Sequence, residues 1–327
     1  MDYAIYIGDL QTVVYKRDFG VVMNEATCVA YAKGADDAVA MGSLAKRMLD
    51  QVGREVIVSL PVRGGRIVDL HGASVFFREI LKKVESAKKP SVLVLIPCSL
   101  SKQEFNHWKK MVYSCNVADA EFVPLVVASA YELGFNLDGL EAGLSVHIGD
   151  TGTDIAVVSL GGIIRGGTIA EGQVECINRL KSYVLSKFNI RISEQMAKQI
   201  LQAVGTLKFG DEVSFLMSGS DATTGGMRES LITGIDCYEV LEPIYSRIIK
   251  AIQQVLIDCP PNVITEICSG NVYFGGVGCD ITHLREFLAR GLELDVKVNG
   301  TSIESAINGA GKMLASSDLI KRIVEAN

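Results

Sequence analysis

Two pairs of short apolar runs, each pair separated by a polar turn, predict a β-hairpin at the N terminus and another near the middle of the chain. The first pair covers residues 3–7 and 13–15, and the second covers residues 144–148 and 155–160. A glycine and an aspartate stand in each intervening segment, and both residue types favour tight turns between antiparallel strands. We therefore expect the same local structure at both places.

Both turns carry the pattern I-G-D-x-x-T, which begins at Ile7 and again at Ile148, a spacing of 148 − 7 = 141 residues. One interpretation is that the pattern is only a favourable turn sequence. The other is that the chain consists of two related halves, each of which points a turn and a threonine at the phosphates of a nucleotide. Backbone N–H groups in such turns bind anions, and hydroxyls can assist them.

Strand and helix patterns alternate through the rest of the chain, which predicts a mixed sheet flanked by helices. Strands are expected over residues 20–23, 55–60 and 91–97, and in the run that leads into Gly275. Helices are expected over residues 40–51, 73–85, 238–258 and 281–290, and a helix–helix stretch is expected at about 174–204.

Two local signals define helix starts more closely. Ser101 and Glu104 form a capping box, and the helix that follows places Phe105, Trp108, Val112 and Cys115 on one face. Pro243 falls in the first turn of the helix expected over residues 238–258, where proline is tolerated.

Composition narrows the possible functions. The chain has 327 residues, 48% of them hydrophobic, and a net charge of −6 without a sustained basic stripe, which argues against nucleic-acid binding. Its eight cysteines are dispersed without a CxxC pair, which indicates a reducing cytoplasm and no zinc site. The N terminus does not have the pattern of a secretory signal, and no apolar run approaches the roughly 18 residues of a membrane span.

Segments along essentially the whole chain resemble the actin superfamily, and specifically its bacterial MreB branch. No single segment is decisive, but all occur in the family's order. They are Gly20-Val21-Val22-Met23-Asn24-Glu25, Gly42-x-x-Ala45-Lys46-Arg47-Met48-Leu49, Pro61-x-x-x-Gly65-x-Ile67-x-Asp69, Val157-Val158-Ser159-Leu160-Gly161-Gly162-Ile163, Pro260-Pro261 and Gly309-Ala310-Gly311-Lys312.

The resemblance implies an α/β actin-like fold of two duplicated RNase-H-like domains, with mixed sheets flanked by helices around a central cleft. Domain I would cover residues 1–141, with an inserted subdomain at about 33–70 and the C-terminal helix at about 305–327 packed back onto it. Domain II would cover residues 142–304, with an insert at about 174–240. Sugar kinases and heat-shock chaperones share the fold, and only the MreB-type segments distinguish among these classes.

The resemblance also implies a site for ATP or ADP with Mg²⁺ between the domains. The residues at the matching positions are Gly8, Asp9, Thr12, Gly149, Asp150, Thr151, Gly152, Thr153, Glu194, Gly275, Gly276 and Val277. Glu194 matches a ribose-contacting glutamate, and residues 275–277 match an adenine-side G-G-G whose third glycine is lost. The surviving glycines have a structural explanation as well, because tight turns need glycine with or without a nucleotide.

The departures from the family fall on the chemistry of the site. The family places D-L-G-T-A-N-T in the first turn and D-I-G-G-G-T-T-E in the second, and Tyr6 and His147 occupy the positions of the two leading aspartates, which brace Mg²⁺. Mg²⁺ prefers oxygen ligands, so neither residue is a natural replacement. His147 could instead be a catalytic or metal-binding histidine, or a buried histidine with a structural role.

Asp9 and Asp150 stand where the family offers a threonine hydroxyl and a small glycine. A carboxylate about 4 Å from a phosphate charge is repelled by roughly 4 kcal/mol at an effective dielectric constant of 20, which would oppose nucleotide binding. The alternative is that both aspartates hold a cation in place of the missing pair.

The hydrolytic E-E-P segment of the family reads Phe122-Val123-Pro124 here. An apolar pair cannot position water for attack on a phosphate. Glu121 lies one position earlier, and on a strand it would face the other way.

These observations lead to two main hypotheses. The first is an MreB-like cytoskeletal or scaffolding protein of the cell-shape type that assembles into filaments or binds partner proteins, with weak or absent hydrolysis. The second is a functional ATP-dependent filament protein in which Asp9 and Asp150 hold Mg²⁺ while Thr12 and Thr153 hold the phosphates. A kinase or chaperone is a third, weaker possibility. The loop over residues 84–90 is polar, so we expect a cytoplasmic protein whose membrane contact is made through partners.

Overall fold

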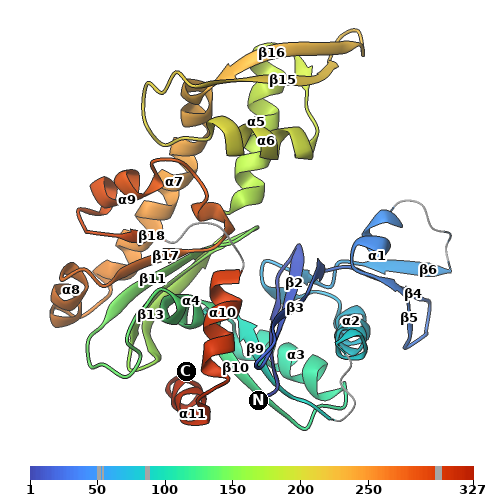
Figure 1. Ribbon diagram of the computed structural model, residues 1–327, viewed down its shortest axis with the longest axis vertical. Helices are drawn as coiled ribbons and strands as arrows, with labels where there is room; N and C mark the ends of the chain where they lie inside the picture. Colours follow the sequence, from blue (N-terminus) through green and yellow to red (C-terminus); the bar gives the residue numbers. More distant parts are fainter. Residues whose placement is uncertain (50–52, 54, 85–88, 299–303) are drawn as a thin grey trace.

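The computed structural model describes residues 1–49, 53, 55–84, 89–298 and 304–327. Two five-stranded mixed sheets carry the fold, and each contains one of the predicted hairpins (Figure 1). The first sheet has the order β10-β9-β1-β2-β3, with β1 Tyr3–Ile7, β2 Gln11–Lys16, β3 Gly20–Ala26, β9 Ser91–Ile96 and β10 Asp119–Pro124. The second has the order β13-β12-β11-β17-β18, with β11 Gly143–Ile148, β12 Thr153–Ser159, β13 Gly162–Ile169, β17 Val272–Gly275 and β18 Lys297–Val298.

The two sheets repeat one topology. In each, the hairpin is extended by a third antiparallel strand on one side and by parallel strands on the other, because β1 pairs with β9 as β11 pairs with β17. Strands buried on both faces read as continuous apolar runs, which is the pattern of β9. Strand β11 is buried along its whole length as well, although Ser145 and His147 interrupt its apolar residues. The predicted duplication is thus visible in the backbone.

Smaller sheets are inserted into each half. In the first half (residues 1–141) they are the sheet β5-β4-β6, with β4 Val29–Ala32, β5 Ala38–Met41 and β6 Val56–Ser59, and the hairpin of β7 Val62–Arg63 and β8 Arg66–Ile67. In the second half (residues 142–304) they are β14 Ile190–Arg191, β15 Ser214–Asp221 and β16 Met227–Thr233. Figure 1 shows β15 and β16 at the top of the molecule and β4–β6 at its right edge.

Helices cover the sheets and connect the halves. They are α1 Ser43–Arg47, α2 Leu70–Lys83, α3 Lys102–Tyr113, α4 Leu125–Glu132, α5 Gln173–Phe188, α6 Glu194–Val204, α7 Gly234–Ile257, α8 Pro261–Cys268, α9 Leu284–Leu292, α10 Glu304–Met313 and α11 Ser317–Ala326, with a 3-10 turn η1 at Val277–Cys279. The capping box of Ser101 and Glu104 begins α3 as predicted. Among the described helices none is both long and apolar enough to cross a bilayer.

Three large apolar cores hold the described part of the molecule together, beside a small fourth cluster around Cys28 and Ala45. One fills the second half and another fills the first. The third lies between the two sheets around α4 and α10, and combines Leu95 of the first sheet with Ala156 and Val158 of the second. The halves therefore share a core at the base of the cleft, where burial of apolar area joins them.

Several element boundaries differ from the sequence-based expectations. The helix predicted over residues 40–51 is wrong at its start, because residues 38–41 form β5 and only Ser43–Arg47 is helical; residues 50 and 51 lie outside the described part. Helix α7 begins at Gly234 behind a capping box of Thr233 and Asp236, so Pro243 lies well inside it and not in its first turn. The expected C-terminal helix is two helices, separated by the N-cap Ser316 of α11.

Candidate functional site

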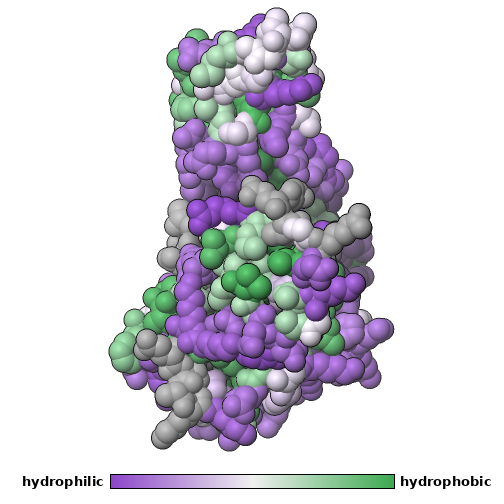
Figure 2. All heavy atoms as spheres, turned by 90° about the vertical axis from the view of Figure 1, so that its right-hand side faces the viewer, coloured by the Kyte–Doolittle hydropathy of each residue, from purple (hydrophilic) through white to green (hydrophobic). Residues whose placement is uncertain are grey.

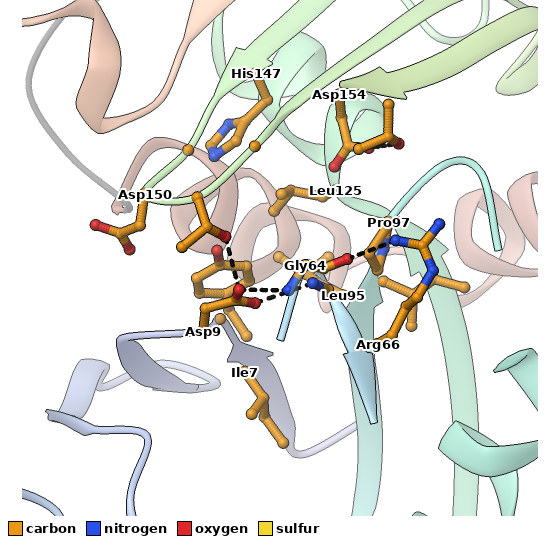
Figure 3. Close-up of a pocket in the computed structure, with 18 of the residues that line it drawn as sticks. Ile7, Asp9, Gly64, Arg66, Leu95, Pro97, Leu125, His147, Asp150 and Asp154 are labelled. Atoms are coloured by element: carbon orange, nitrogen blue, oxygen red, sulfur yellow. Dashed lines mark hydrogen bonds between the residues drawn. The ribbon is translucent and has the colours of Figure 1, made fainter. Parts of the chain in front are cut away.

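A cavity of about 210 Å³ lies between the two halves, where both predicted turns meet (Figure 3). The first half contributes the β1–β2 turn, the β7–β8 turn, the end of β9 and Leu125. The second half contributes the β11–β12 turn with His147, Asp154 and the end of β13. Of the matched residues, Gly8, Asp9, Gly149, Asp150, Thr151 and Gly152 line this cavity.

The two turns have the same backbone construction. Ile7 pairs with Thr12 at the end of the first hairpin, and Ile148 pairs with Thr153 at the end of the second. Gly8 N–H donates to Gln11 O at 2.9 Å, and Gly149 N–H donates to Gly152 O at 2.8 Å. The repeated pattern thus encodes the same four-residue turn twice.

Asp9 is held by three donors. Gly65 N–H donates to its Oδ1 at 2.9 Å, Gly64 N–H donates to Oδ2, and the Thr151 hydroxyl donates to the same Oδ2 at 2.7 Å. Gly64 and Gly65 form the β7–β8 turn, whereas Thr151 belongs to the opposite half. Asp9 therefore joins three segments of the cleft, as the dashed lines in Figure 3 show.

Asp150 has a different environment. Its Oδ2 is buried and has no hydrogen-bond partner among the described residues. Burial raises the pKa of this carboxyl to about 6, with Asp9 adding repulsion while Lys198 and Lys46 oppose the shift. Its backbone carbonyl accepts from Val174 N–H at 2.8 Å and so helps to begin α5.

Tyr6 and His147 fill the positions where the resemblance implies Mg²⁺-bracing aspartates. The Tyr6 hydroxyl lies 2.6 Å from the point where a Cβ on Gly8 would stand, so its ring covers the first turn. His147 is 2% exposed, and neither ring nitrogen has a partner in the described structure. Burial lowers its pKa to about 4, so the imidazole is neutral at pH 7.

A second polar cluster crosses the cleft beside this cavity. The Thr168 hydroxyl donates to Asp154 Oδ1, and the Ser99 hydroxyl lies 2.5 Å from Thr168 Oγ1. Cys98 Sγ lies 3.5 Å from the same Asp154 oxygen. Burial raises the pKa of Asp154 and also that of the Cys98 thiol.

Thr12 and Thr153 do not line the cavity. Both are fully buried, and each hydroxyl is used within its own half: Thr12 Oγ1 lies 2.9 Å from Thr27 Oγ1, and Thr153 Oγ1 donates to Glu171 O at 2.6 Å. The structure therefore gives both threonines a structural role.

The predicted adenine-side residues are only partly brought together. Val277 lines a separate cavity of about 160 Å³ with Gln173, Tyr245 and Lys198. Glu194 does not line it and forms an ion pair with Lys198 at 2.8 Å, which lowers the pKa of Glu194. Gly275 and Gly276 have contacts that explain them without a ligand, because a Cβ on Gly275 would meet Ser129 Oγ at 2.6 Å and one on Gly276 would meet Ile148 O at 2.4 Å.

The wall where the family has its hydrolytic glutamates is apolar. Phe122 and Val123 are buried, and Leu125 faces the cavity. Glu121 lines a different groove, which lies between α3, β10 and α11, so it faces away from the turns as predicted. Thus no described carboxylate near residues 121–125 faces the site.

Tyr6 and His147 do not fit the Mg²⁺ positions that the resemblance implies. Mg²⁺ beside a nucleotide is held by one or two carboxylates together with phosphates, and neither of these side chains supplies a carboxylate oxygen. Asp9 already accepts three hydrogen bonds, and Mg²⁺ requires several oxygen ligands in near-octahedral geometry.

Sequence reasoning missed the β7–β8 turn and the Cys98–Ser99 segment as parts of the site. The turn carries a detectable signal, since Gly64-Gly65 between short strands is typical of a two-residue hairpin with positive φ. Nothing in the local sequence of Cys98 and Ser99 indicates that they face β12 and β13.

Comparisons with known proteins agree with this architecture. The model of the MreB/Mbl protein family matches residues 1–322. The cell shape-determining protein MreB of Escherichia coli (strain K12) is 24% identical over 327 residues, covering 97% of this chain and 94% of that protein. The cell shape-determining protein Mbl of Bacillus subtilis (strain 168) is 24% identical over 328 residues, covering 98% of each.

Solved structures show the same fold. MreB5 of Spiroplasma citri bound to ADP gives a TM-score of 0.86 at 22% identity, covering 99% of this chain and 98% of that one. The MamK double helical filament gives a TM-score of 0.75 at 17% identity, covering 96% and 99%. The actin-like fold is therefore confirmed, and this chain belongs to the MreB/Mbl family of bacterial actin-like cytoskeletal proteins.

Proposed function

We propose that this protein is a cytoskeletal or scaffolding subunit of the cell-shape type that works by self-assembly or partner binding, with weak or no nucleotide hydrolysis. One observation carries the proposal: Tyr6 and His147 occupy the cavity where the family resemblance implies carboxylates for Mg²⁺. Neither side chain supplies a carboxylate oxygen, and His147 is buried. We expect the protein to act in the cytoplasm and to reach the membrane through partners.

The apolar wall supports the same proposal. Leu125 faces the cavity near residues 122–124, where the resemblance implies a glutamate pair. Hydrolysis of a γ-phosphate requires a group that orients the attacking water, and a leucine side chain cannot accept a hydrogen bond.

The outer surface is consistent with assembly or partner binding. Figure 2 shows apolar side chains gathered in the middle of the face that carries β4–β6, bordered by hydrophilic ones. Exposed apolar residues of this part of the chain include Val39, Leu44 and Ile57. Exposed apolar patches are common at protein–protein interfaces.

Titration calorimetry with Mg-ATP, combined with a phosphate-release assay and sedimentation with and without nucleotide, tests the proposal. We expect no heat of binding, no released phosphate, and assembly that is independent of nucleotide. The triple variant Tyr6→Asp/Asp9→Thr/His147→Asp is the matched test of the cause, since it restores two carboxylates, removes the charge of Asp9 and should gain Mg-ATP binding. Phosphate release by the wild-type protein that Asp150→Ala abolishes would contradict the proposal.

A second candidate is an ATP-dependent filament protein with a rearranged site. The cavity beside Val277 favours it, as does the S. citri neighbour solved with ADP or AMPPNP. In this case Mg-ATP should raise the melting temperature through ligand linkage. No shift at millimolar Mg-ATP would count against this candidate.

A further inference from the structure

The donors around Asp9 form a receptor of the kind that proteins use for anions. Gly64 and Gly65 have φ values of +58° and +68°, and consecutive backbone N–H groups in such turns converge on one point. Both N–H groups donate to the Asp9 carboxylate, and the Thr151 hydroxyl completes the set. Donors in this arrangement suit a phosphate or a carboxylate equally well.

The turn that carries the receptor is held in place by packing and by an ion pair. A Cβ on Gly65 would lie 2.3 Å from Pro97 Cγ, so the turn is packed tightly against the loop that follows β9. Arg66, the next residue, forms an ion pair with Glu104 at the start of α3. The N–H groups of the turn are thereby held toward Asp9.

The contacts of this receptor also connect the two walls of the cleft. Asp9 belongs to the first half and Thr151 to the second, and the hydroxyls of Ser99 and Thr168 make a second, neutral link between the halves nearby. The hydrogen bond from Thr151 to Asp9 is partly buried, and a hydrogen bond to an ionised group stabilises more than one between neutral groups.

We infer that Asp9 is an internal anion that occupies the phosphate-type receptor of Gly64, Gly65 and Thr151 and thereby holds the two halves closed without a nucleotide. This inference rests on the proposed function in one respect. If Asp9 were bound to Mg-ATP, its carboxylate could not also occupy the receptor of Gly64, Gly65 and Thr151. With Asp9 in the receptor, the cleft would be constitutively closed, and the receptor would be blocked against external phosphates by the protein's own carboxylate.

Hydrogen exchange of the β7–β8 turn in the nucleotide-free monomer tests the inference. In the wild-type protein the Gly64 and Gly65 amides should be protected, and millimolar Mg-ATP should leave their exchange unchanged. Asp9→Ala should speed their exchange roughly tenfold or more, because the acceptor is lost. Asp150→Ala is the matched control, at the same position of the other turn, and should leave this exchange unchanged.

Chemical rescue shows whether the missing group is the anion. Formate added to Asp9→Ala should restore protection of the two amides, whereas chloride at equal ionic strength should not. Fast exchange in the wild-type protein, or unchanged exchange in Asp9→Ala, would overturn the inference, and so would equal effects of formate and chloride.

A distance measurement tests the closure separately and does not require Asp9→Ala to fold. Spin labels at Lys33→Cys and Glu212→Cys, two exposed sites on opposite halves, can be used in a background with Cys268→Ser. Thr151→Val removes only the cross-half donor and should broaden and lengthen the distance distribution, whereas Thr151→Ser should not. An unchanged distribution in Thr151→Val would overturn the closure. If calorimetry detects nucleotide binding while the Gly64 and Gly65 amides stay protected with and without Mg-ATP, the proposed function is contradicted and the inference about Asp9 is not.

Discussion

The turns of residues 8–11 and 149–152 have the same sequence pattern, the same closing pair and the same internal hydrogen bond, yet their aspartates have opposite environments. Asp9 accepts three hydrogen bonds, two of them from the β7–β8 turn inserted in its own half. Asp150 has a buried oxygen without a described partner. The second half has no counterpart of the β7–β8 turn among the described strands that line the cavity, so Asp150 is left without those donors.

This difference shows that a turn motif determines backbone geometry but not the state of the charge it carries. An aspartate at this turn position stabilises the fold where hydrogen-bond donors converge on it, as at Asp9. It opposes folding where burial removes its water and no protein donor takes the place of that water, as at Asp150.

The largest effect is expected for Asp9→Ala. Removing the carboxylate leaves three donors without their acceptor and should lower the free energy of unfolding by about 2–4 kcal/mol. Urea denaturation at pH 7.5 measures this change. Asp150→Ala should not destabilise by a comparable amount, and equal losses in the two variants would show that the turns are equivalent after all.

Asp150→Asn should stabilise the protein at neutral and alkaline pH. The folded-state pKa of about 6 exceeds the ordinary aspartate value of 3.8, so the ionised form of Asp150 opposes folding above that range. The gain should be close to zero below pH 4 and should approach up to about 3 kcal/mol above pH 7. Urea unfolding at pH 5 and pH 8 checks the sign, and Asp9→Asn is the control that should destabilise.

His147 should make stability fall as the solution becomes acidic. Its folded-state pKa is lowered from 6.5 to about 4, so the unfolded state binds the proton first as pH decreases through this window. The His147 contribution to this loss between pH 8 and pH 4.5 should be about 2.5 kcal/mol. It is measured as the difference between the wild-type protein and His147→Leu, because Asp150 changes the stability of both proteins in the opposite direction. Tyr6→Phe changes the equivalent position of the first turn and should leave the pH dependence as it is in the wild-type protein.

The smallest effects are expected for the two threonines. Thr12→Val and Thr153→Val each remove one buried hydrogen bond, so each should lower the free energy of unfolding by about 1 kcal/mol. Neither should change the response of the protein to Mg-ATP in thermal unfolding. A nucleotide effect specific to either variant would show that its hydroxyl serves the ligand.

Much of the architecture could be predicted from local patterns. The hairpins, the start of α3 at Ser101 and the strand β9 follow from periodicity and capping. The helix predicted over residues 40–51 is longer than the observed α1. Ala40 and Met41 have helical propensity, but in the structure they belong to β5 and pair with β4. The sequence pattern predicts the start of helix α7 four residues too late, at residue 238. The true start at Gly234 is hard to recognise because its capping box at Thr233 directly follows a strand.

The sequence by itself determined the duplicated turns, the actin-like order of segments and the replacement of two expected aspartates by Tyr6 and His147. These are properties of position along the chain. Only the tertiary structure decided that Asp9 would meet Gly64, Gly65 and Thr151, and that Asp150 would meet no such donors. The physical reason is that hydrogen bonding and desolvation depend on groups distant in sequence, which the folded chain alone brings together.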